Sequence, residues 1–115
     1  NRIGDIGHAV SSVAKRAGLG VVREYTGHGI GRDMHEEPLV PNFGLRHTGA
    51  RIEEGMVLAI EPMLTLGSHK THVMGDGWLV VTRDSSPAAH FEKTVAVTAE
   101  GPVLVSAEPD RKRPL

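Results

Sequence analysis

Four short segments carry side chains that could bind a metal ion or move a proton. They are residues 27–31 around His28, residues 35–38, residues 60–63 around Glu61, and residues 90–94 around Glu92. The chain has no Cys, so a metal ion here must be held by imidazole and carboxylate groups. Its seven His outnumber its aromatic side chains, and imidazole is the commonest metal ligand. These segments favour a His and carboxylate metal site.

Glu61 directly follows an apolar run, residues 56–60, which predicts a carboxylate that is poorly hydrated. Burying a carboxylate without a partner costs several kcal/mol. A metal ion fits as the partner, and His28 with Glu92 could complete such a site. Taken singly, Glu61 could instead form an ion pair with an Arg, and His28 could be an ordinary loop residue.

Composition excludes several other classes of function. Thirteen Lys and Arg against 14 Asp and Glu give a net charge of −1, which offers no argument for binding nucleic acid or an acidic membrane. No apolar run approaches the roughly 20 residues of a membrane span, and no signal region opens the chain. We expect a soluble, cytoplasmic protein, truncated at its N-terminus because helical spacing begins almost at Asn1.

The apolar spacing predicts one helix followed by an antiparallel sheet. Residues 5–17 form the helix, with Asp5 as N-cap, Gly18 as the stop, and a buried face made by Ile6, Ala9, Val10, Val13 and Ala14. The alternating glycines of residues 27–31 predict an irregular segment, and residues 35–49 a loop. Residues 19–25 have strand character, and strands 56–63 and 78–82 are expected to form a hairpin joined through 67–77. Residues 91–97 and 102–105 are expected to form a final pair of strands, followed by a frayed tail, 108–115.

Four motifs in order then resemble a known family. The segments GHGIGRDMHEEP, EEGMVLAIEPM, DGWLVVTRD and AAHFEKTVAVT are similar, in order and spacing, to the second half of type I methionine aminopeptidases of peptidase family M24. The resemblance runs from about Asn1 to Ser106. It implies an α/β (α+β) fold, the C-terminal half of the pita-bread fold, over residues 1–107. It also implies two divalent metal ions, Co, Mn, Fe or Zn, between the two halves of the fold.

The resemblance also implies a role for each matching residue. His28 would bind one metal, Glu61 would bind the same metal and act as general base and then acid, and Glu92 would bridge both metals. His35 would contact the substrate peptide and stabilise the tetrahedral intermediate. Met34 and Trp78 would line the pocket for the methionine side chain.

The implied activity is metal-dependent removal of the N-terminal methionine from nascent polypeptides, especially before a small second residue. The ribosome is a further partner to consider, whereas no nucleic acid or membrane partner is expected. Two aspartate ligands and a second substrate-binding histidine belong to the family's first half, so this chain by itself is expected to be inactive. Two positions depart from the family pattern: Lys93 stands where His is usual, and Met34 where an aromatic residue is common.

Other functions remain open from the sequence. An X-Pro aminopeptidase or a creatinase-like hydrolase usually has Gly after the Glu-Pro of the second motif, where this chain has Met63. A type II methionine aminopeptidase would carry a long insertion between His35 and Glu61. A relative that binds peptides without catalysis would have lost its metals, and the presence of His28, Glu61 and Glu92 speaks against it. An unrelated small β protein that binds one metal through these three residues is opposed only by the order of the motifs.

Overall fold

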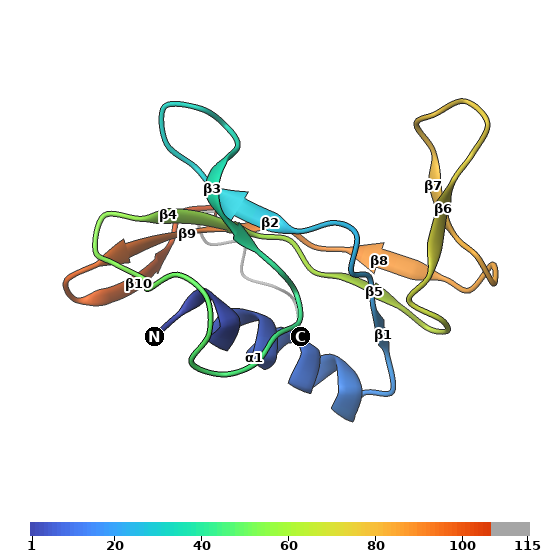
Figure 1. Ribbon diagram of the computed structural model, residues 1–115, viewed down its shortest axis with the longest axis horizontal. Coiled ribbons are helices and arrows are strands. Elements are labelled where there is room, and N and C mark those ends of the chain that lie inside the picture. The colour runs from blue at the N-terminus through green and yellow to red at the C-terminus, as the bar shows by residue number, and fades with distance from the viewer. Residues whose placement is uncertain (107–115) are drawn as a thin grey trace, which may run out of the picture.

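The computed structural model describes residues 1–106 as a helix beneath a set of antiparallel strands (Figure 1). Helix α1 (Ile3–Arg16) lies along one face of a five-stranded sheet. The order of strands in this sheet is β10 (Gly101–Leu104), β9 (Lys93–Thr98), β4 (Val57–Ile60), β2 (Gly27–Gly29) and β3 (Glu36–Val40). The predicted fold class, a helix followed by mainly antiparallel strands, is confirmed.

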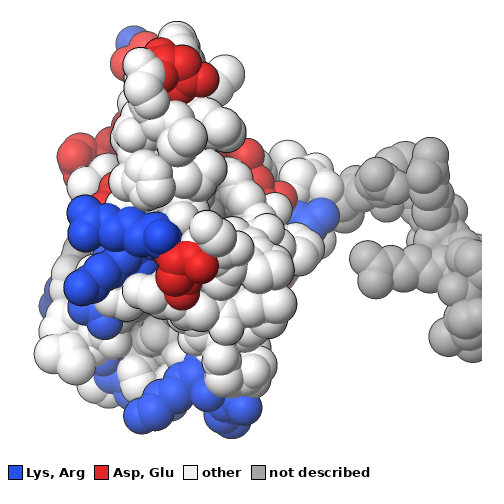
Figure 2. All heavy atoms as spheres, turned by 90° about the vertical axis from the view of Figure 1, so that its right-hand side faces the viewer, with Lys and Arg blue, Asp and Glu red and all other residues white. Residues whose placement is uncertain are grey.

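Two smaller sheets extend from the five-stranded one, where the sequence predicted a single sheet. One has the order β1 (Gly20–Val21), β5 (Met63–Thr65) and β8 (Ala88–His90). The other is a hairpin of β6 (Thr71–Val73) and β7 (Val80–Thr82), which stands out from the body at the right of Figure 1. Seen from that end, much of the surface carries no charged side chain, and Lys and Arg gather in its lower half (Figure 2).

Helix α1 begins two residues before the predicted start, so the prediction of Asp5 as N-cap is wrong. Asp5 lies inside the first turn, where its Oδ2 accepts a hydrogen bond of 2.7 Å from the backbone N–H of Arg2. A carboxylate one turn into a helix can serve the helix N-terminus in this way. At 14 residues α1 is too short to cross a membrane, and residues 1–106 contain no other helix.

The core lies between α1 and the sheet. Ile3, Val40 and Leu58 are buried together, and partly buried apolar side chains pack around them: Ile6, Ile52, Met56 and Ile60. Val13 and Ala9, both predicted on the buried face of the helix, are exposed, Val13 by 57%, whereas Ala14 is buried. The buried face therefore begins at Ile3 and is narrower than the spacing predicted.

Residues 27–29 of the glycine-rich segment form an inner strand of the sheet, so the prediction of an irregular segment over 27–31 is wrong for these three residues. β2 pairs with both β3 and β4, and all three of its residues are buried. A Cβ atom at Gly27 would collide with the carbonyl oxygen of Ala59, and one at Gly29 with that of Glu37. The glycines are thus explained by the close approach of neighbouring backbones.

The first part of the predicted loop 35–49 is also a strand. β3 contains Pro38, and it forms the edge of the sheet, where a residue without an N–H is tolerated. The pairing shifts register between His28, opposite Leu39, and Gly29, opposite Glu36. This bulge accommodates the extra residues around Pro38.

Pairing among the later strands differs in part from the prediction. β4 pairs with β2 and β9, and β7 pairs with β6, so the expected hairpin between 56–63 and 78–82 is wrong. The final pair is confirmed as β9 and β10, which turn at Gly101 with φ of +118°. The predicted frayed tail, residues 108–115, lies outside the described residues.

Candidate metal centre

Glu61 and Glu92 face each other where two sheets part. Ile60 pairs with Lys93 at the end of the β4–β9 ladder, and Met63 pairs with His90 at the end of the β5–β8 ladder. Between the ladders one backbone hydrogen bond of 3.0 Å, from Phe91 N–H to the Pro62 carbonyl, keeps the two chains together. Both carboxylates therefore project from a short stretch that is fixed on either side by strand pairing.

His28 completes a cluster with these two carboxylates. One ligand atom from each of His28, Glu61 and Glu92 lies within 4.8 Å of the other two. His28 is held in β2 opposite Ala59 and is buried, the Glu61 side chain is 14% exposed, and Glu92 is exposed. The structure thus brings together the three residues that the sequence singled out as metal ligands.

The hydrogen bonding of His28 makes this cluster suitable for a cation. Its Nδ1 lies 2.9 Å from the carbonyl oxygen of Gly29, which can only accept, so Nδ1 carries the proton. In the neutral imidazole Nε2 then presents a lone pair, and it faces Oε2 of Glu61 at 3.4 Å. Two acceptors facing each other require a second proton or a cation between them. A divalent metal fits, because imidazole and carboxylate are both suitable ligands.

His35 lies beside the cluster rather than in it. The ring centroids of His28 and His35 are 4.0 Å apart, with the ring planes tilted by 38°. His35 itself is exposed, at the end of the loop that joins β2 to β3. Its imidazole is therefore next to that of His28 and open to an incoming molecule.

Met34 and Trp78 are both strongly exposed in the described chain. Met34, in the same loop as His35, is 74% exposed. Trp78 is 88% exposed at the turn of the β6–β7 hairpin, where Asp76 Oδ1 accepts its backbone N–H at 2.9 Å. Their predicted part in a methionine pocket remains a prediction.

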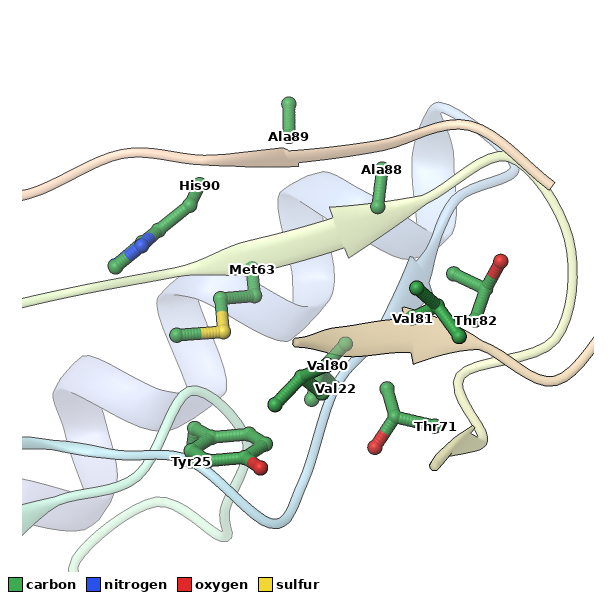
Figure 3. A pocket seen from close by; sticks show the side chains of 10 residues that line it. All are labelled: Val22, Tyr25, Met63, Thr71, Val80, Val81, Thr82, Ala88, Ala89 and His90. Carbon is green, nitrogen blue, oxygen red and sulfur yellow. The ribbon is translucent and has the colours of Figure 1, made fainter. Parts of the chain in front are cut away.

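An apolar pocket of about 310 Å³ adjoins the cluster. Figure 3 shows His90 of β8 and Met63 of β5 pointing into it, with the ring of Tyr25 on the opposite side. The other lining residues are Val22, Thr71, Val80, Val81, Thr82, Ala88 and Ala89. His90 therefore belongs both to the wall of this pocket and to the surroundings of Glu61.

Sequence reasoning missed two residues near Glu61. His90 was assigned to the surface, yet its Nε2 lies 3.9 Å from Oε1 of Glu61. A usable signal was its place two residues before Glu92, in the same motif. Asn42 is 1% exposed, and its Nδ2 donates to the backbone carbonyl of Glu61 at 3.0 Å. No local pattern marks Asn42, because its partner is 19 residues away.

Comparison with known proteins identifies relatives along almost the whole described chain. Residues 1–99 match the model of metallopeptidase family M24. A methionine aminopeptidase of Clostridium acetobutylicum is 47% identical over 106 residues, which cover 92% of this chain and 42% of that protein. A methionine aminopeptidase of Borreliella burgdorferi is 51% identical over 107 residues, covering 92% of this chain and 43% of that protein.

A solved structure agrees with the sequence comparison. The methionine aminopeptidase of Thermotoga maritima superposes with a TM-score of 0.90 at 43% identity, over 93% of this chain and 43% of that one. The chain thus spans less than half the length of the relatives it matches. Their names do not favour an X-Pro aminopeptidase or a creatinase-like hydrolase. With its family match running from residue 1 to residue 99, the chain belongs to metallopeptidase family M24.

Proposed function

We propose that the chain supplies three metal ligands of a methionine aminopeptidase, which removes the N-terminal methionine from nascent polypeptides, especially before a small second residue. The observation that carries this proposal is the cluster of His28, Glu61 and Glu92, in which the lone pair of His28 Nε2 faces a Glu61 oxygen at 3.4 Å. Relatives named methionine aminopeptidase support the choice of substrate.

The family is metal-dependent, and we propose two divalent ions, Co, Mn, Fe or Zn. When bound, such ions polarise the scissile carbonyl and make a water molecule more acidic. His28 offers its Nε2 lone pair to one ion, and Glu61 offers Oε2 beside it. Glu92, in the segment between β8 and β9, would be the ligand shared by both ions, because each of its two carboxylate oxygens is a suitable metal ligand.

Proton transfer is the second role of Glu61. Its side chain is largely buried, with 14% exposure, and the Asn42 amide holds its backbone. It takes a proton from the attacking water and delivers it to the leaving amine, as a positioned carboxylate can. His35 is open to solvent beside His28, and it donates a hydrogen bond to the negative charge that develops on the substrate oxygen.

Substrate side chains are received by apolar surface near these groups. We keep Met34 and Trp78 as the proposed contacts for the methionine side chain. The apolar pocket beside Glu61, lined by Met63 and Tyr25, accommodates another part of the peptide close to the cleaved bond. We further propose a cytoplasmic location, with the ribosome as a partner, because the substrates are nascent chains.

The test is release of free methionine from the peptide Met-Ala-Ser with Mn²⁺ or Co²⁺ added. Two samples are compared: the 115-residue chain, and a chimera in which it replaces the matching segment of the Thermotoga maritima enzyme. We expect activity in the chimera alone, because two aspartate ligands come from the family's first half. Glu61→Gln and His28→Ala should abolish it, while His72→Leu, at an exposed β6 residue, should not. An active chimera that both site variants leave unchanged would refute the proposal.

A further inference from the structure

The carboxylate of Glu61 has an imidazole on each side. Its Oε2 lies 3.4 Å from Nε2 of His28, and its Oε1 lies 3.9 Å from Nε2 of His90. The His28 side is accounted for by the proposed metal ion. The His90 side is not, because a metal ion bound through Oε2 does not explain why a second imidazole faces Oε1.

His90 is placed there by strand pairing. It is the last residue of β8 and lies opposite Met63 of β5, two residues beyond Glu61. Glu92 follows two residues later, in the short segment between β8 and β9, and a ligand atom of each lies close to Glu61. Its side chain is 46% exposed, which leaves the ring free to turn by the small amount needed to close 3.9 Å to a hydrogen bond.

We propose that His90 is a positioning residue that donates its Nε2–H to Oε1 of Glu61. Ligand carboxylates in metal sites are commonly fixed by a hydrogen bond to the oxygen that does not bind the metal. With Oε1 held by His90, Oε2 stays turned toward His28, as the structure has it. The inference rests on the proposed metal site and adds a residue to it. His90 itself binds no metal in this account.

The ring also separates the metal ligands from the apolar pocket. His90 lines that pocket with Met63 while its Nε2 faces Glu61 (Figure 3). A side chain of similar size without an N–H would preserve this wall but leave Oε1 without its donor. Volume and hydrogen bonding can therefore be tested separately.

The first experiment measures Co²⁺ binding to the 115-residue chain by calorimetry and by the visible absorption spectrum of the bound ion. His90→Leu keeps most of the volume and removes the donor, His90→Gln restores an N–H donor, and His72→Leu is the matched control on an exposed histidine. We expect His90→Leu to weaken binding about 10-fold and to alter the spectrum. His90→Gln should recover most of the affinity, and His72→Leu should leave it unchanged.

Two results overturn the inference: unchanged binding in His90→Leu, or a loss in His90→Gln as large as in His90→Leu. His28→Ala distinguishes these from failure of the metal site itself, because it must abolish binding if the site is correct. A second measurement needs no metal. Imidazole ¹⁵N spectra of the metal-free chain should show the proton of His90 on Nε2, with a change in Glu61→Ala. A proton on Nδ1, or no response to Glu61→Ala, contradicts the inference even if no Co²⁺ binds.

Discussion

Replacing Gly27 by Ala tests whether the close approach of β2 and β4 holds the site together. The added Cβ would collide with the carbonyl oxygen of Ala59 and lie 3.3 Å from Cβ of Val40. Because the obstacle is the backbone of a neighbouring strand in the middle of the sheet, it cannot turn aside as a flexible side chain would. Overpacking of this kind costs about 1–3 kcal/mol, and we expect a value near the upper end.

Such a loss is large beside the roughly 5–15 kcal/mol that stabilises a typical domain. Urea unfolding should therefore show a clearly lower midpoint for Gly27→Ala with a similar slope. Binding of Co²⁺ should weaken as well, because His28 follows Gly27 in the displaced strand. The matched control is Gly75→Ala, since a Cβ at Gly75 meets nothing within 4 Å. Equal midpoints for the two variants would refute the packing argument.

Three further predictions concern single side chains. Asn42→Ala leaves the Glu61 carbonyl without its donor and should destabilise the fold by about 1–3 kcal/mol in urea unfolding, whereas a change below about 0.5 kcal/mol would contradict this. The Ser68 N–H and the Ser86 hydrogen bonds hold the pKa of Asp84 at about 2, below 3.8, so its stabilisation is present above pH 3.8 and lost as pH falls through 2. In Asp84→Asn the midpoint of urea unfolding should depend less on pH across that window. The same fall in midpoint with acid as in the unmodified chain would contradict the assignment. The fluorescence of Trp78, the sole Trp of this chain, should be that of a water-exposed indole. A blue shift on adding a methionyl peptide to the active chimera would support its place in the substrate pocket, and no shift would count against it.

Elements with strong local signals were predictable from the sequence. The spacing of apolar residues located α1 to within two residues, and Gly101 marked the turn between β9 and β10. The ligand cluster was predictable through the order of the motifs, although His28, Glu61 and Glu92 are far apart in the chain. The resemblance indicated that these three residues meet, because a shared site constrains residue types more strongly than it constrains local structure.

Elements that depend on distant neighbours were not predictable. β2 was missed because glycine has low strand propensity, and its use there depends on the Ala59 and Glu37 carbonyls of two other strands. β6 pairs with β7 across the turn that Asp76 stabilises. It was missed because residues 67–77 were expected to be a connection between two strands. His90 was missed for a similar reason, because its proximity to Glu61 follows from the register of β5 and β8.

The most direct test of the metal centre is anomalous diffraction from crystals of the chain soaked in Mn²⁺. The account predicts a manganese peak bonded to Nε2 of His28 and Oε2 of Glu61, with Glu92 beside it, and no peak there in His28→Ala crystals. A peak bound only to other residues, or none at saturating Mn²⁺, would contradict the assignment of these three residues as metal ligands.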